Sequence, residues 1–239
     1  MIIQDDKPQD PNSLSPGVGS SYGNGINKLS KYFLNLLLVI IVAFLFGIPI
    51  FILNISYYFN YTIEVTTLWM VFIYIYEFFV TSPLQYGVAY VYLKAARDEK
   101  PEVKDLTKVL ENYWNIVLVN VLVGIIVFVG FLLFIIPGIY FLCKLAFVRY
   151  LVVEEKMPAL DAINASWKMT DGHAATIFLM GVLAIPISIA GLVLFGIGII
   201  LSDMWIETAF ASMYHAVSLE KGVYRAGTGQ SGQGRGSPI

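Results

Sequence analysis

Cysteine and histidine are scarce in this sequence, which limits the chemistry that it can perform. It has one cysteine, Cys143, so a disulfide within the chain and any motif of several cysteines are excluded. Cys143 lies inside an apolar run, where a thiol is expected to pack rather than react. The two histidines, His173 and His215, are not spaced as metal ligands. We therefore predict no metal, no cofactor and no enzymatic activity.

Charged residues are also few. Only 13% of the 239 residues are charged, whereas 57% are hydrophobic, and the mean hydropathy is +0.71. A soluble domain of this length could not bury so much apolar surface, but a bilayer removes the need to bury it. The net charge of −2 gives no basis for a nucleic-acid partner. The composition therefore predicts an integral membrane protein.

The two ends of the chain differ in composition from its middle. Residues 1–27 are rich in Pro, Gly, Ser, Asp and Asn and lack the apolar region of a signal peptide. Residues 222–239 are rich in Gly, Ser and Gln. Both segments are predicted to be disordered cytoplasmic tails. The remaining residues, 28–221, are predicted to form one six-helix transmembrane domain.

Long apolar runs define the predicted helices. About 20 apolar residues are needed to cross about 30 Å of hydrocarbon. Six segments meet or approach this length: Tyr32–Ile55, Leu68–Leu93 with a break at Thr81–Pro83, Trp114–Ile136, Ile139–Val153, Ala174–Ile197 and Met204–Leu219. The predicted fold class is an all-α, polytopic membrane helical bundle.

Lysine and arginine are distributed unevenly along the chain, and this predicts its orientation. The alternating loops at residues 57–65, 136–138 and 198–203 contain neither residue type, whereas thirteen of the fifteen cations lie on the opposite side. Because cytoplasmic loops of membrane proteins are enriched in Lys and Arg, both termini are predicted to be cytoplasmic. We predict a multi-pass protein of the cell (inner or plasma) membrane.

Two cytoplasmic loops carry amphipathic patterns. One helix is predicted after Pro101, a favourable first helical position. Another is predicted after Pro158, with Leu160, Ile163 and Trp167 on its apolar face. This spacing fits a helix in the headgroup plane, and it equally fits a helix that packs over the inner mouth of the bundle.

Four charged residues fall within the predicted spans, where each costs at least about 2.5 kcal/mol at mid-bilayer unless it is paired. Glu77 and Arg149 lie roughly 15–18 Å from the outer surface, and Lys144 and Glu207 roughly 5–8 Å from it. Matching depths predicts the pairs Glu77–Arg149 and Lys144–Glu207. Such pairs fit a polar cavity for an anion, a lipid headgroup or protons, and they also fit structural ion pairs that fix helix packing.

Several motifs resemble one broad prokaryotic membrane family. The residues that carry the resemblance are Phe134–Tyr140 (FIIPGIY), Arg149–Tyr150, Val153–Glu154, Ala162, Ala165–His173, Gly87, Tyr90 and Lys94–Arg97. The family includes the membrane domain of glycerophosphoryl diester phosphodiesterases and many stand-alone six-helix proteins of unknown function. The similarity covers about residues 86–220.

The resemblance implies a fold rather than an activity, because the phosphodiesterase chemistry of the fused relatives belongs to a separate soluble barrel. The family's Pro-Gly turn maps to Pro137 and Gly138, and its Ser and Gly positions map to Ser166 and Gly172. These residues are expected to reverse the chain between two spans and to cap the second amphipathic helix.

The sequence thus predicts a membrane protein without a catalytic site, acting as a scaffold, anchor or regulatory subunit. Its expected partners are the lipid bilayer and either another membrane protein or further copies of itself. The alternative is a small transporter or lipid-handling protein with a polar site near Glu77 and Arg149. Pro49, Pro83 and Pro186 would then mark bendable helices.

Overall fold

The computed structural model describes residues 14–59, 63–193 and 197–222, and every regular element in these ranges is a helix. In chain order they are α1 (Val18–Phe59), α2 (Ile63–Tyr76), the π-helix η1 (Glu77–Thr81), α3 (Ser82–Ala96), the 3₁₀ helix η2 (Val103–Asn112), α4 (Tyr113–Leu133), α5 (Ile135–Lys144), α6 (Val148–Glu154), α7 (Ala159–Met169), α8 (Ala174–Val193) and α9 (Ile197–Glu220).

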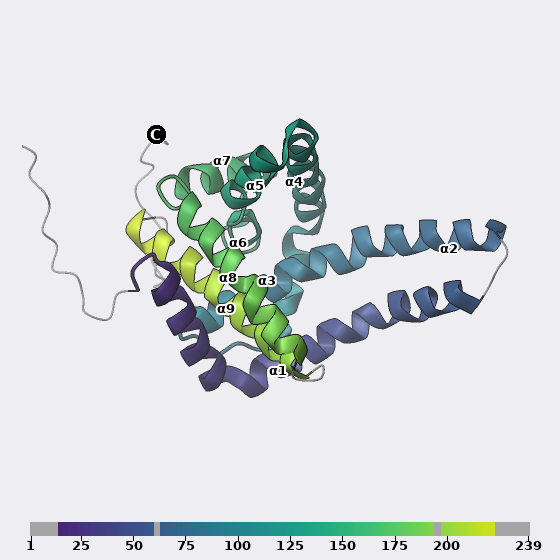
Figure 1. Ribbon diagram of the computed structural model, residues 1–239, viewed down its shortest axis with the longest axis horizontal. Coiled ribbons are helices and arrows are strands. Elements are labelled where there is room, and N and C mark those ends of the chain that lie inside the picture. Colours follow the sequence, from purple (N-terminus) through teal and green to yellow (C-terminus); the bar gives the residue numbers. More distant parts are fainter. Residues whose placement is uncertain (1–13, 60–62, 194–196, 223–239) are drawn as a thin grey trace, which may run out of the picture.

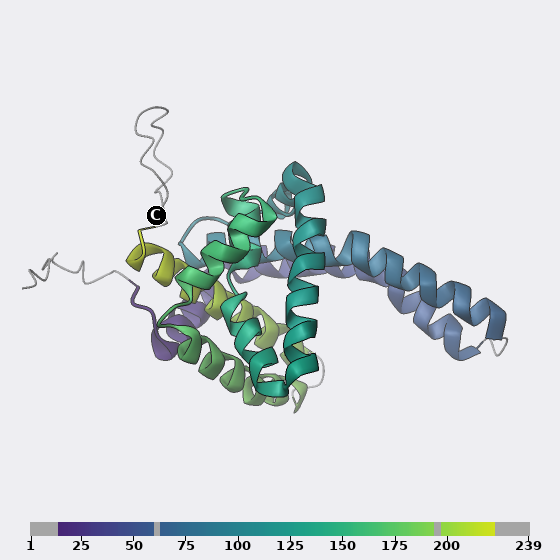
Figure 2. The same ribbon diagram turned by 90° about the horizontal axis from the view of Figure 1, so that it is seen from above.

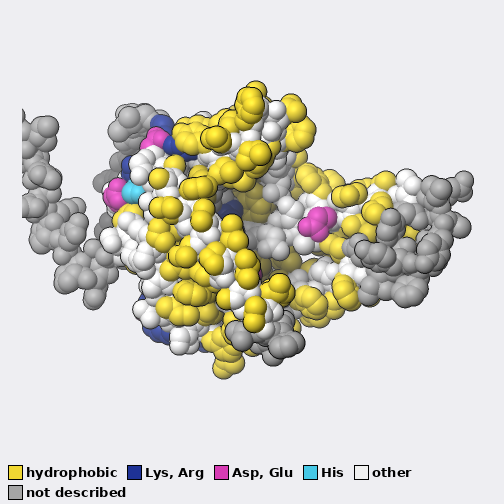
Figure 3. All heavy atoms as spheres, viewed as in Figure 1, with side chains coloured by type: hydrophobic (Ala, Val, Ile, Leu, Met, Phe, Trp, Pro, Cys, Tyr) yellow, Lys and Arg dark blue, Asp and Glu magenta, His cyan; other side chains and the backbone are white. Residues whose placement is uncertain are grey.

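Within the described residues, four helical stretches are long and apolar enough to cross a membrane. They are Val18–Ile52, Val103–Leu133, Ile135–Glu154 and Ala174–Val193. Hydrophobic side chains cover much of the face that Figure 3 shows. The all-helical fold and the apolar helices agree with the class that the composition predicts.

The amino-terminal segment is more ordered than its composition suggested. Residues 1–13 lie outside the described residues, but Val18–Asn27 belongs to α1, so the predicted disordered tail over 1–27 is wrong in this part. Its small residues permit close packing: a Cβ on Gly25 would lie 3.0 Å from the Ala209 nitrogen of α9. The Trp205 indole of α9 also donates a hydrogen bond to the Tyr22 carbonyl oxygen at 2.9 Å.

Helix α1 bends at Tyr32, where φ is −110° and ψ is 19°. Before the bend it packs along α9, and after the bend it runs beside α2. These two arms, Phe33–Phe59 and Ile63–Tyr76, form the α1–α2 hairpin, which projects away from the other helices (Figures 1 and 2). The Tyr76 hydroxyl donates a hydrogen bond to the Phe46 carbonyl oxygen at 2.8 Å and joins the arms near the base of the hairpin.

The predicted break at Thr81–Pro83 coincides with the π-helix η1, which connects α2 and α3 without ending the helical run. Pro83 has no N–H group, so it cannot donate the helical hydrogen bond to Phe79. The Tyr113 hydroxyl of α4 instead donates a hydrogen bond to the Phe79 carbonyl oxygen at 2.5 Å. A neighbouring helix thus satisfies the carbonyl that proline leaves free.

The chain reverses between α4 and α5 at Phe134, which is extended with φ −169° and ψ 164°. The prediction of a reversal at Pro137 and Gly138 is therefore wrong by three residues. Pro137 lies in the first turn of α5, where a missing N–H group leaves no helical hydrogen bond unmade. Gly138 permits close packing instead, because a Cβ there would lie 2.5 Å from the Phe131 ring.

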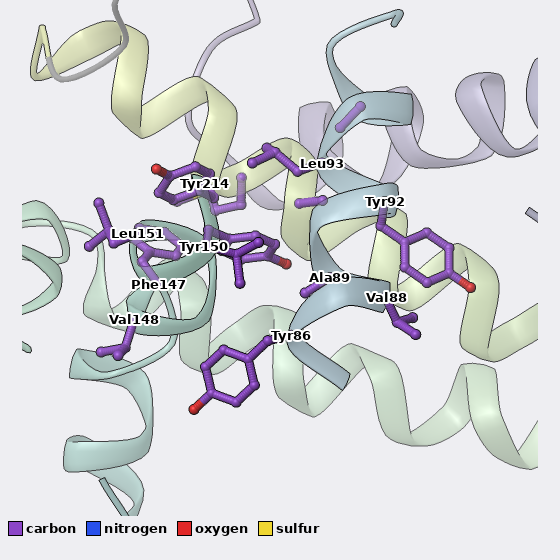
Figure 4. Packing of buried hydrophobic residues seen from close by; sticks show 14 of the residues in the cluster. Tyr86, Val88, Ala89, Tyr92, Leu93, Phe147, Val148, Tyr150, Leu151 and Tyr214 are labelled. Atoms are coloured by element: carbon purple, nitrogen blue, oxygen red, sulfur yellow. The ribbon is translucent and has the colours of Figure 1, made fainter. Parts of the chain in front are cut away.

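The core lies where α3, α6 and α9 meet. Figure 4 shows Leu93 of α3 on the side of Tyr150 and Leu151 of α6, with Tyr214 of α9 beside them, while Tyr92 points to the opposite side of α3. Each of these five side chains is nearly or fully buried. The predicted fourth span is interrupted here: α5 ends at Lys144 and α6 begins at Val148, which places the short helix α6 inside the body.

Helices η2 and α7, which lie where the two amphipathic helices were predicted, each bury only part of their apolar residues. In η2, Leu106 and Val109 are buried while Leu110 is exposed. In α7, Ile163 is buried and the Trp167 ring lies 5.7 Å from the Phe141 ring of α5. Leu160 is 65% exposed, so it does not belong to the packed face. The packed face of α7 is completed by small or flexible residues: Ala159, Ala162, Ser166 and Met169.

Candidate functional site

The main charged contact within the helices joins Arg149 of α6 to Glu207 of α9. Arg149 Nη2 lies 2.9 Å from Glu207 Oε2, and Nη1 donates to Oε1 at 3.2 Å. Arg149 Nη2 also donates to the Tyr150 hydroxyl at 2.9 Å. The guanidinium carbon lies 4.9 Å from the centre of the Tyr150 ring. The two-point contact orients the guanidinium as well as neutralising its charge.

This contact corrects both predicted pairs. Helix α9 begins at Ile197 rather than at Met204, so Glu207 lies ten residues into the helix. At 1.5 Å per residue this is about 15 Å, which matches the depth estimated for Arg149. The prediction failed because the start of the last helix was placed too late in the sequence.

Lys144 has a different partner from the one predicted. Its ammonium group forms an ion pair with Asp171, directly after α7, and donates to the Trp167 carbonyl oxygen at 3.4 Å. The proximity of Asp171 to Lys144 depends on how α7 packs against the end of α5, which the sequence does not show. Glu77 is exposed, and no basic side chain within the described residues forms an ion pair with it.

Further polar contacts extend from Arg149 towards the predicted inner end of α9. The Tyr150 and Tyr214 rings stack with centroids 4.7 Å apart (Figure 4). The Tyr214 hydroxyl donates to Glu154 Oε2 at 2.9 Å. Glu154 also forms an ion pair with Arg97, which lies directly after α3. Arg97 Nε donates to His215 Nδ1 of α9 at 3.4 Å.

We refer to the set Glu207, Arg149, Tyr150, Tyr214, Glu154, Arg97 and His215 as the core polar chain. Its members come from α6, α9 and the end of α3, and every contact except Arg149–Tyr150, which lies within α6, joins two of these segments. Removing water from a charged group is costly, and a buried ion pair offsets this cost only with good geometry and additional hydrogen bonds. The tyrosines and the histidine supply those additional contacts.

A cavity of about 400 Å³ adjoins the Arg149–Glu207 end of the core polar chain. Arg149 and Glu207 line it together with Gln85 and Tyr86 of α3, and the rest of its wall is apolar. The Tyr86 hydroxyl donates to Asn120 Oδ1 at 2.8 Å. Asn120 Nδ2 donates in turn to Ser82 Oγ at 2.6 Å. The cavity therefore combines a charged pair with a large apolar wall.

The break between α5 and α6 is held by hydroxyl groups from α7. Ser166 Oγ donates to the Lys144 carbonyl oxygen at 2.8 Å and accepts from the Phe147 N–H group at 3.3 Å. Ser166 is fully buried, and a buried polar group must be hydrogen-bonded. Its hydroxyl meets this requirement because it donates one hydrogen bond and accepts another. Gly172 follows α7 with φ +85°, a conformation that favours glycine.

A second charged cluster lies at the loop after α3. Asp98 forms ion pairs with Lys31 at 2.6 Å and with Lys28 at 2.9 Å, both from α1. Hydrogen bonds from Lys31 and Lys28 hold the pKa of the Asp98 carboxyl well below its usual range. Asp98 has φ +67°, a backbone conformation that Asp tolerates better than most residues.

Sequence reasoning did not assign five members of the core polar chain to a site, namely Tyr150, Tyr214, Glu154, Arg97 and His215, and it also missed Asn120, which contacts Tyr86. Asn120 could have been found, because it is the single amide in the middle of the apolar run of α4. Glu154 and Arg97 occur in the segments that carry the family resemblance, but no sequence pattern brings them together. Their contact depends on the packing of α6 against α3.

The fold and these contacts define an all-helical protein with apolar helices that suit a membrane and a charged contact network in its core. Comparisons with protein-family models, curated proteins and solved structures find no match to this chain.

Proposed function

We propose that this protein is a non-enzymatic, multi-pass protein of the plasma membrane that holds a partner membrane protein. We also propose that it belongs to the broad prokaryotic six-helix family that its FIIPGIY segment resembles. The observation that carries the scaffold proposal is the α1–α2 hairpin, whose apolar arms project from the body (Figures 1 and 2).

Both arms of the α1–α2 hairpin expose large apolar side chains. On α1, Phe44 is 65% exposed and Phe51 is 62% exposed, and on α2 Tyr74 is 69% exposed. Lipid can cover such surfaces, but helices in a membrane also associate through van der Waals packing. A hairpin that leaves its own bundle offers faces on which a helix of another protein can pack.

The core polar chain supports this proposal because it holds together the helices to which the α1–α2 hairpin is attached. It ties α3, α6 and α9 together, and α1 before Tyr32 packs along α9. A rigid body of this kind gives the α1–α2 hairpin a fixed attachment. The charged side chains of the core polar chain contact one another, and this fits a structural role in holding α3, α6 and α9 together.

In the proposed topology the six spans are α1 after Tyr32, α2 with α3, α4, α5 with α6, α8 and α9. Helices η2 and α7 lie at the cytoplasmic face. The α1–α2 hairpin and the α4–α5 pair point in different directions (Figure 2). Both can cross one flat bilayer only if the hairpin bends at its base, where η1 interrupts the regular α-helical hydrogen bonds.

Cysteine labelling tests this topology. In a Cys143→Ser background, Ile136→Cys at the α4–α5 turn is expected to react with a membrane-impermeant thiol reagent added outside intact cells. Glu99→Cys, in the loop after α3, is expected to react only after the cells are opened. Ile136 is 81% exposed and Glu99 is exposed, so access to the side chain does not limit either reaction. Labelling of Glu99→Cys from outside would contradict the six-span orientation.

Purification from native membranes tests the scaffold function. We expect the protein extracted in mild detergent to retain a stoichiometric protein companion. Phe44→Ala should reduce the retained companion at least severalfold, because it removes an exposed ring from the hairpin. Phe128→Ala on α4 is the matched control, since Phe128 is 68% exposed and Phe44 is 65% exposed. The absence of any stoichiometric companion would overturn the scaffold proposal.

One observation favours a second candidate function, the handling of a lipid or small anion. The cavity beside Arg149 and Glu207 has an apolar wall and a charged pair at one end, which together suit an amphiphile with a polar or charged headgroup. In that case, the purified protein should carry a specific lipid or anion that Glu207→Gln alters in amount. An unchanged lipid composition in Glu207→Gln would argue against this candidate.

A further inference from the structure

Glu77 differs in its surroundings from the paired charges of the core. It is exposed, and its neighbours on the same stretch of helix, Tyr74, Ile75 and Phe79, are also exposed, at 69%, 52% and 39%. These residues line an open hollow of about 550 Å³ together with Phe78 and Ser82. Figure 3 shows acidic atoms next to hydrophobic surface at the base of the α1–α2 hairpin.

Glu77 lies deep within a continuous helical run. It follows Ile63, the start of α2, by fourteen residues and precedes Ala96, the end of α3, by nineteen. At 1.5 Å per residue these separations are about 21 and 28 Å. A carboxylate at this depth in a bilayer is costly unless it has a partner, and such residues are markers of function.

The two cations predicted to lie within the spans have partners in this chain. Arg149 contacts Glu207, and Lys144 contacts Asp171. Within the described part of the chain no cation pairs with Glu77, and those two basic side chains are already engaged. A second copy of the chain would therefore present the same occupied cations. A cation that pairs with Glu77 at this depth would therefore come from a different protein.

The local backbone also marks this position. Glu77 is the first residue of the π-helix η1, and single π-helical turns within α-helices frequently occur at functional sites. The extra residue in the turn changes the direction of the side chains that follow. This turn separates the exposed residues around Glu77 from α3, where Tyr86 and Tyr92 are both buried.

We propose that Glu77 is the docking point for a transmembrane helix of a partner protein that carries an arginine or lysine at mid-membrane depth. This inference rests on the proposed scaffold function and names the contact and the chemistry of the partner. The exposed apolar residues around Glu77 pack against the partner helix, and its cation pairs with the carboxylate. A lipid headgroup is a poorer occupant, because headgroup amines lie at the membrane surface rather than about 20 Å into a helical run.

A designed transmembrane peptide tests the inference directly. The peptide is a polyleucine helix with one central arginine, and the comparison peptides carry leucine or glutamate at that position. Binding to the full-length protein in phosphatidylcholine vesicles is measured by resonance energy transfer between dyes on the two chains. We expect the arginine peptide to bind the wild-type protein at least tenfold more tightly than it binds Glu77→Gln. The leucine and glutamate peptides should bind both proteins equally weakly.

Two variants act as controls. Glu99→Gln makes the same change at an exposed carboxylate in the cytoplasmic loop, and it should bind the arginine peptide as the wild type does. Glu77→Asp keeps the charge and should retain most of the binding. Equal binding of the arginine peptide to wild type and Glu77→Gln, or equal binding when the arginine is moved to the peptide end, would overturn the inference.

The outcome is separable from that of the scaffold proposal. A native companion that stays bound to Glu77→Gln would contradict the docking role of Glu77 and leave the scaffold proposal unaffected. Because Glu77 is exposed, Glu77→Gln should keep the thermal unfolding midpoint of the wild type, and this measurement guards against a loss of binding through misfolding.

Discussion

Arg149→Met is expected to destabilise the folded protein by roughly 1–3 kcal/mol, less than for a fully buried ion pair, because the Arg149 and Glu207 side chains are 31% and 26% exposed. The substitution leaves the Glu207 carboxylate within the helices without its guanidinium partner. It also removes the hydrogen bond to the Tyr150 hydroxyl. The loss should appear as a lower unfolding midpoint in mild detergent, measured by fluorescence or by circular dichroism.

A double-mutant cycle identifies the partner of Arg149. Arg149→Met combined with Glu207→Met should be less destabilised than the sum of the single variants, because no unpaired charge remains. Arg149→Met combined with Glu77→Gln should show simple additivity, since Glu77 makes no contact with Arg149 that the structure records. Coupling between Glu77 and Arg149 would contradict the observed pairing and restore the one predicted from depth.

Gly191→Ala is expected to destabilise the protein by roughly 1–3 kcal/mol, the usual cost of inserting a methyl group into a tightly packed contact. Gly191 lies on α8 where this helix meets α9. A Cβ at this position would lie 2.5 Å from the Gly198 carbonyl oxygen and would also clash with Ser202 Oγ. Because one obstacle is backbone, the two helices must move apart to accept the new atom.

Gly181→Ala is the matched control on the same helix. A Cβ there meets nothing within 4 Å. Alanine has a higher helix propensity than glycine by about 1 kcal/mol, so this variant should be neutral or slightly more stable than the wild type. Equal destabilisation of both variants in thermal unfolding would show that the α8–α9 contact is not the cause.

The helix boundaries show what proline positions in the sequence can and cannot predict. Proline at position 83 indicated the break between α2 and α3, because its missing N–H group is a local property. The same reasoning gave a wrong position at Pro137, where it predicted the chain reversal. A proline is tolerated in the first turn of a helix, and the reversal lies at Phe134 instead. The local rule identified an interruption in both cases, but it could not say on which side of the proline the helix begins.

The amino-terminal segment shows a different limit. Its Gly, Ser and Asn residues have the composition of a disordered tail, yet Val18–Asn27 is helical. The reason is tertiary: Gly25 allows α1 to approach α9, and the Tyr22 hydroxyl donates to the Met180 carbonyl oxygen of α8 at 2.9 Å. Small polar residues lower the intrinsic tendency to form a helix, but they also permit close contacts with neighbouring helices. The local sequence does not show which helices make these contacts.

The sequence by itself determined the class of this protein, because apolar content and run length depend on residue type and order alone. It also identified Glu77, Lys144, Arg149 and Glu207 as unusual, since a charge in an apolar run is costly wherever its helix packs. Only the tertiary structure decided their partners. Arg149 contacts Glu207, Lys144 contacts Asp171, and Glu77 faces outwards, because these contacts depend on where each helix begins and on which helices lie side by side.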